Sequence, residues 1–160
     1  MMLCTTAFVS CGDKEEKEDK EDSRYAVRSK ITAANSSAAS LYDAINTAMT
    51  EMDEDGIDTR YYISVSHNKG DDSVSIELDG MSSGEGEEKM MYEKILNYFN
   101  DVDKLDFEAK FYSGTCVAVA CKENDTYTGT KPAVATIDNY KDYSDDLEKA
   151  LADAFKKAMG

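Results

Sequence analysis

Hydrophobic residues recur at alternating spacings of three and four between residues 25 and 53. This pattern predicts a long amphipathic helix that buries one side. Gly56 follows the pattern, and glycine tolerates the left-handed conformation that closes many helices. The residues of the predicted stripe are Ile31, Ala34, Ala38, Leu41, Ile45, Ala48 and Met52.

Apolar and polar residues alternate strictly in the next two segments, 61–66 and 73–79. Such alternation predicts strands with one buried face and one wet face. Residues 68–71, Asn-Lys-Gly-Asp, are a turn signal between them, so we expect an antiparallel hairpin. The expected core positions are Tyr61, Ile63 and Val65 in the first strand and Val74, Ile76 and Leu78 in the second.

A second hairpin is predicted around a turn at residues 113–114. Before this turn, Phe107, Ala109 and Phe111 share one face of a strand. After it, residues 116–121 are apolar or small on both faces. We therefore expect the strand after the turn to be central and covered on both sides.

Two shorter helices complete the pattern, one over residues 88–100 and one near the C-terminus with Ser144 as its N-cap. A polar loop is expected over residues 123–143. The order predicts an α+β fold, in which the long N-terminal helix packs on an antiparallel sheet of about four strands. The apolar faces expected for these helices are Met91, Ile95, Tyr98 and Phe99 in the middle one and Leu147, Ala150, Leu151, Ala154 and Phe155 in the last.

Composition and charge narrow the class of protein. The 160 residues are 41% hydrophobic, enough for one domain with a core. The 33 Asp and Glu outnumber the 18 Lys and Arg, giving a formal charge of −15. That balance argues against nucleic acid as a partner and against adsorption to anionic lipid through charge. The chain shows neither a Gly-rich phosphate loop nor an HExxH motif, so we expect no cofactor and no enzymatic activity.

The N-terminal residues resemble a bacterial lipoprotein lipobox, Phe-Val-Ser-Cys, ending at Cys11. The resemblance implies that residues 1–10 are part of a lipoprotein signal peptide and that Cys11 receives a diacylglycerol. Residues 11–24 then form an acidic, solvated tether. No basic n-region precedes the apolar stretch, so we expect the true start upstream or a truncated chain. The alternative is a frayed terminus in which Cys11 is an ordinary thiol.

Three segments are similar to type IV pilins and pseudopilins, in particular to pilin-like proteins of clostridial Gram-positive bacteria. They are residues 32–42, 115–120 and 125–132. The resemblance implies a pilin-like globular domain over residues 25–160, with pilus or envelope proteins as partners. Pilins, however, begin with a processed segment and an apolar transmembrane helix, which the lipobox-like start replaces here. A head of this kind could cap, bind or mimic a filament, but could not polymerise by the usual pilin route.

One acidic run has a partial calcium pattern. Glu51, Asp53 and Asp55 followed by Gly56 overlap the first half of an EF-hand loop. Tyr62 stands where the bidentate glutamate should be, so the run is a weak candidate for a Ca²⁺ site. The alternative is a helix C-terminus with solvated acids and no metal.

Cys116, Cys121 and the one histidine, His67, are interpreted as structural residues. Cys116 and Cys121 lie about 16 Å apart on one expected strand and point to opposite faces, so we expect buried free thiols. His67, at the rim of a hairpin turn, is expected to be solvated.

Tyr127, Tyr140 and Tyr143 lie in or beside the long loop. They either contact a sugar or partner protein or pin the loop to the domain.

The sequence supports two hypotheses about function. The first is a non-enzymatic, extracytoplasmic surface lipoprotein, anchored in the membrane through Cys11, in adhesion, pilus- or secretion-related assembly, or envelope interaction. The second is an extracytoplasmic module that binds a small ligand or carbohydrate.

Overall fold

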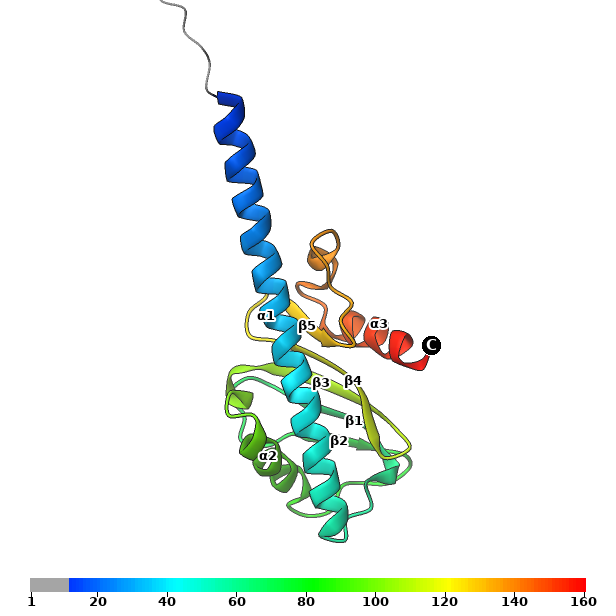
Figure 1. Ribbon diagram of the computed structural model, residues 1–160. Helices are drawn as coiled ribbons and strands as arrows, with labels where there is room; N and C mark the ends of the chain where they lie inside the picture. Colours follow the sequence, from blue (N-terminus) through cyan, green and yellow to red (C-terminus); the bar gives the residue numbers. More distant parts are fainter. Residues whose placement is uncertain (1–11) are drawn as a thin grey trace, which may run out of the picture.

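One long helix, α1 (Gly12–Glu54), packs along a five-stranded antiparallel sheet and extends beyond it (Figure 1). The computed structural model describes residues 12–160, with side chains from residue 20 onward. Two further helices, α2 (Glu87–Tyr98) and α3 (Leu147–Met159), complete the domain. The predicted α+β architecture is confirmed, with five strands where about four were expected.

The strands follow the order β2-β1-β3-β4-β5, and all neighbours are antiparallel. The fifth strand lies inside the segment 123–143 that was expected to be a loop. Its sequence, Thr-Gly-Thr-Lys, has no hydrophobic alternation that would predict a strand. The strand is buried because α1 packs directly on its backbone. The bounds are β1 Tyr62–His67, β2 Ser75–Leu78, β3 Asp106–Tyr112, β4 Thr115–Lys122 and β5 Thr128–Lys131.

The stripe predicted for α1 is confirmed: all of its residues are buried except Ala34, which is half-buried. The helix begins at Gly12, well before the expected residue 25. Glu and Lys are strong helix formers, and Glu16 precedes Lys20 by four residues, a spacing that favours a helix. Residues 20–26 are all exposed. None of the helices within residues 12–160 combines the length and apolarity needed to cross a membrane.

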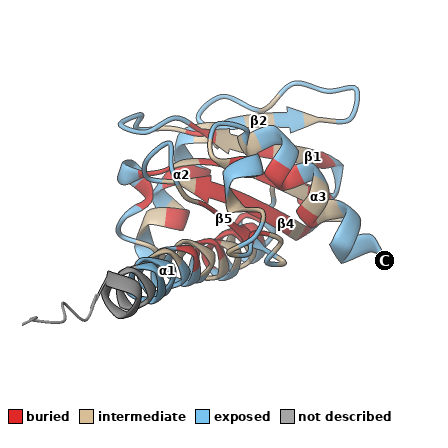
Figure 2. Cartoon of the chain, turned by 90° about the horizontal axis from the view of Figure 1, so that it is seen from above, coloured by how far each residue is buried: buried red, intermediate tan, exposed pale blue. Residues whose placement is uncertain are grey.

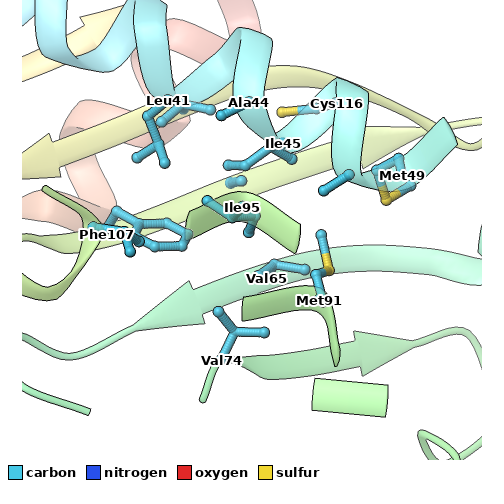
Figure 3. Packing of buried hydrophobic residues seen from close by; sticks show 14 of the residues in the cluster. Leu41, Ala44, Ile45, Met49, Val65, Val74, Met91, Ile95, Phe107 and Cys116 are labelled. Atoms are coloured by element: carbon cyan, nitrogen blue, oxygen red, sulfur yellow. The ribbon is translucent and has the colours of Figure 1, made fainter. Parts of the chain in front are cut away.

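The main core lies between α1, α2 and one face of the sheet (Figure 3). Figure 2 shows the buried residues gathered between α1 and the strands. α3 covers the opposite face, where Ala118 and Ala120 of β4 join a second cluster with Ala150, Leu151 and Ala154. β4 is therefore flanked by strands and covered on both faces, as predicted. Fully buried members of the main core include Leu41, Ile45, Val65, Met91, Ile95, Phe107 and Val119.

The approach of α1 to the sheet is very close at β5. A Cβ built on Gly129 would lie 1.9 Å from the carbonyl oxygen of Ala34, so only glycine fits there. Two asparagines of α1 also reach strand backbones. The Asn35 side chain accepts from the amide of Thr130 at 3.0 Å. Asn46 accepts from the amide of Cys116 at 3.0 Å and donates to its carbonyl oxygen at 3.3 Å.

The structure corrects the predicted phase of β1. The register shifts between Tyr62 and Ser64, so Tyr62 is buried whereas Tyr61 is 44% exposed. The Tyr62 hydroxyl donates to Glu87 at the start of α2. This bulge moves the expected core position from Tyr61 to its neighbour, because an irregularity in pairing changes which residues face the core.

Two details of the helices also differ from the prediction. Tyr98 is 52% exposed rather than buried, and its hydroxyl donates to Glu51 of α1. Asp146, not Ser144, caps α3, since its carboxylate accepts from the amide of Lys149 at 2.8 Å. Ser144 instead donates to the carbonyl oxygen of Lys141.

Candidate functional site

Two carboxylates of the acidic run at the end of α1 form ion pairs with a lysine of α2. Lys94 of α2 lies 2.8 Å from a carboxylate oxygen of Asp55 and 3.5 Å from one of Glu51. The hydrogen bond to Asp55 raises the pKa of Lys94. Asp53 is exposed and lies outside this pair. No three His, Cys, Asp or Glu side chains in the described part of the chain gather as metal ligands.

His67 is buried, contrary to the expectation of a solvated turn residue. Its ring is stacked between those of Tyr92 and Phe107, with both centroid distances 5.4 Å. Nδ1 lies 2.8 Å from the carbonyl oxygen of Leu105, and Nε2 lies 3.0 Å from that of Asp71. Both ring nitrogens therefore contact backbone, and the histidine connects the hairpin turn to Leu105, the residue that precedes β3.

Cys116 and Cys121 are free and buried, as predicted. Both belong to the cluster that faces α1, so the expectation that they point to opposite faces was wrong. The pairing of β3 with β4 shifts between Lys110 and Phe111, and this irregularity turns Cys116 toward α1. Burial raises the pKa of Cys121 to about 12 and raises the pKa of Cys116 as well. Neither thiol is thus a nucleophile at neutral pH.

The three tyrosines proposed as ligand contacts divide into two groups. Tyr127 and Tyr140 stack on each other, with centroids 5.5 Å apart and planes 18° apart. Tyr143 is buried in the cluster against which these two tyrosines pack; its hydroxyl donates to Asp153 at 3.1 Å, and Lys149 lies over its ring. These contacts support the structural alternative for Tyr143, which fastens the loop to α3.

Each tyrosine of the stacked pair lines a hollow. Tyr140 lines an open hollow of about 450 Å³ between α1 and residues 137–141, together with Arg24 and Asp138. Tyr127 lines a smaller one of about 170 Å³ beside Lys30 of α1. Because the stacked faces are occupied by each other, a ligand would meet only the two outer faces.

A larger groove lies on the outer face of the sheet, opposite α1. It has a volume of about 600 Å³ and runs over β1 and β3 alongside α3. Its floor combines polar side chains with the apolar residues Ile63, Val65 and Phe111, and its wall on α3 is largely apolar. The floor carries Ser64, Ser66, Glu77, Glu108 and Lys110, and the wall carries Glu148, Leu151, Ala152 and Phe155.

The groove is electrostatically negative. Three glutamates line it against one lysine. Burial raises the pKa of the Glu108 carboxyl, the negative charge of Glu148 raises it further, and Lys110 opposes the shift. Ser64 donates to Glu77 at 2.6 Å and orients that carboxylate. The arrangement suits the binding of a positively charged, partly apolar group.

Sequence reasoning did not identify this groove. The alternation that put Phe107, Ala109 and Phe111 in the core also implied that Glu108 and Lys110 face the other way. That signal was present. The position of α3 beside them was not predictable, because it depends on contacts between segments about 40 residues apart.

Cys11 and residues 1–10 lie outside the described residues. Comparisons of the chain with protein-family models, curated proteins and solved structures give no match.

Proposed function

We propose that this protein is a non-enzymatic surface lipoprotein in which α1 is a helical stalk that carries a pilin-like head. The observation that carries the proposal is the division of α1 into two parts. From Leu41 to Met52 the helix is part of the main core, whereas residues 20–26 are exposed (Figure 1). The exposed part leads back toward Cys11.

The dimensions fit a spacer. Between Gly12 and Ser23, the first residue of α1 that lines the hollow against residues 137–141, the helix rises about 17 Å at 1.5 Å per residue. A helical stalk of that length holds the head at a defined distance from its attachment point, which a flexible tether does not do.

Charge makes a covalent anchor necessary for membrane attachment. A protein with a formal charge of −15 is repelled by anionic lipid, so electrostatic adsorption would not retain it. A diacylglycerol on Cys11 would supply two acyl chains, and stable anchoring takes two such signals.

On the resemblance of three segments to pilins, we propose that the head acts in adhesion, in pilus- or secretion-related assembly, or in envelope interaction. Support comes from the order of elements, with a long N-terminal helix packed on an antiparallel sheet. Pilus or envelope proteins are the partners that this role implies.

Metabolic labelling of the full-length gene product with an alkyne-tagged fatty acid tests the anchor. We expect a label that partitions with membranes in the wild type and disappears in Cys11→Ala. Cys4→Ala is the matched control, because Cys4 lies in the segment that would be removed, and it should keep the label. A wild type without label, or a label that survives Cys11→Ala, would refute the proposal.

The second candidate, an extracytoplasmic carbohydrate-binding module, rests on the position of Tyr140. This tyrosine lines the 450 Å³ hollow beside Arg24, where a sugar could contact an aromatic ring. Glycan-array binding that is lost in Tyr140→Ala and kept in Tyr25→Ala, an exposed tyrosine on the stalk, would favour this function over the first.

A further inference from the structure

Only half of the outer face of the sheet is covered by a helix. α3 packs its Ala150, Leu151 and Ala154 over β4, whereas the main core with α1 and α2 lies on the opposite face. β2, β1 and part of β3 are bare there, and the groove occupies this bare region. With strands about 4.8 Å apart, two uncovered strands are about as wide as one α-helix.

The lining combines two kinds of surface. Ala152 and Phe155 present apolar groups along the α3 side; Ala152 is exposed and Phe155 is only partly buried. Glu77, Glu108 and Glu148 place carboxylates on the floor and rim. Lys110 is the one cationic side chain among the lining residues.

The three carboxylates of the groove have only one neighbouring cationic side chain, Lys110, among the lining residues. Glu108 has Lys110 as a neighbour but also the carboxylate of Glu148, and its pKa is raised rather than lowered. Among the ion pairs of the described residues, none includes Glu77, Glu108 or Glu148. A bound cation would relieve this repulsion, as expected for a surface whose charge is complementary to a partner.

We propose that this groove binds a basic amphipathic helix of a partner protein, which lies beside α3 and completes the helical layer on the outer face of the sheet. Apolar residues of that helix pack against Ala152 and Phe155. Its Lys or Arg side chains, spaced three or four apart, pair with Glu108, Glu148 and Glu77.

This inference goes beyond the proposed function and does not depend on lipid attachment. The head would use the groove whether or not Cys11 carries a lipid. Fatty-acid labelling therefore tests the lipid anchor, and peptide binding tests the groove. A negative result in one experiment leaves the other proposal standing.

The probe is a 14-residue helical peptide with Leu on one face and Lys on the other, titrated into the ¹⁵N-labelled 160-residue protein. A Leu/Glu peptide with the same pattern is the comparison. We expect amide shifts concentrated at Ser64, Ser66 and Lys110 and along α3, and no saturable binding of the Leu/Glu peptide.

Variants separate the groove from the general acidity of the protein. Glu108→Gln with Glu148→Gln should weaken the Leu/Lys peptide about tenfold. The control pair, Glu85→Gln with Glu93→Gln, removes the same charge at exposed positions outside the groove and should leave affinity within about twofold. Phe155→Ala should weaken binding while leaving the net charge unchanged.

Two results would overturn the proposal. One is a set of shifts spread over the whole acidic surface. The other is an equal loss of affinity in the groove pair and the control pair. Spectra of the free variants show whether each one keeps the wild-type fold. Because Gln has nearly the same shape as Glu, we expect both double variants to fold as the wild type does.

Discussion

The ring of His67 lies nearly parallel to the ring of Tyr92, with 5.4 Å between centroids and 18° between planes. This contact joins the end of β1 to α2. Phe107 stacks on the other face of the histidine, and the two ring nitrogens contact the carbonyl oxygens of Leu105 and Asp71. A residue that the sequence placed at an exposed turn is thus a central connection of the main core.

Replacing His67 with Phe should destabilise the protein by about 1–3 kcal/mol, because the aromatic stacking is kept but the ring N–H no longer donates to a buried backbone carbonyl oxygen. Urea unfolding followed by circular dichroism measures the change. Asn68→Ala, at the exposed neighbouring position, should change stability by no more than about 0.5 kcal/mol. Equal stability of His67→Phe and wild type would contradict the role given to the ring nitrogens.

Gly129→Ala should be among the most damaging single-methyl changes in the chain. The new Cβ would lie 1.9 Å from the carbonyl oxygen of Ala34, so α1 must move away from β5. We expect a loss of several kcal/mol, or failure to fold, since backbone atoms cannot yield as a side chain can. Gly84→Ala is the control, because its Cβ meets only the flexible end of Glu87 at 3.1 Å. Thermal unfolding compares them, and similar midpoints would refute the close approach.

Asn46→Ala removes two hydrogen bonds between α1 and the backbone of Cys116. The unpaired amide and carbonyl of this buried strand residue should cost about 1–3 kcal/mol, despite the better helix propensity of alanine. Thr50→Ala removes only a hydrogen bond within α1 at an exposed position, and should be close to neutral. If denaturant midpoints of the two variants coincide, the Asn46 contacts contribute nothing to docking of α1.

Glu108→Gln should raise stability at pH 7. The folded-state pKa of Glu108 is raised, mainly by burial, so the folded protein binds this proton more tightly than the unfolded chain. The resulting stabilisation is complete below the unfolded pKa of about 4.3 and is lost as the pH rises through the higher folded value.

The advantage of the Gln variant should therefore shrink as the pH falls and vanish below about pH 4. Chemical unfolding at several pH values between about 3.5 and 7 measures it. Glu93→Gln, on the exposed side of α2, should show no such trend. A Gln variant less stable than wild type at pH 7 would mean that Glu108 is stabilised by Lys110 rather than burdened by its surroundings.

Helical periodicity was a reliable guide in this chain. The stripe of α1 and the buried residues Ala150, Leu151 and Ala154 of α3 follow from spacing within each helix. These signals are local, because one helix turn repeats every 3.6 residues regardless of what covers it. The start of α1 was less predictable, since helix propensity rather than an apolar face extends it to Gly12.

Strand details were harder to predict where pairing is irregular. Bulges in β1 and β4 exchanged Tyr61 for Tyr62 in the core and turned Cys116 toward α1. β5 has no hydrophobic pattern from which a strand could be predicted. In each case the deciding contact comes from a distant segment, as with Asn46 and Cys116, which are 70 residues apart.

The acidic groove shows the same division. Alternation in β3 is enough to send Glu108 and Lys110 to the face opposite Phe107, and the charge of −15 is evident from composition. The volume between these residues and Phe155 exists because α3 returns across β4 and stops short of β1. Periodicity in the sequence specifies which way a side chain faces, whereas the packing of distant elements specifies what it faces.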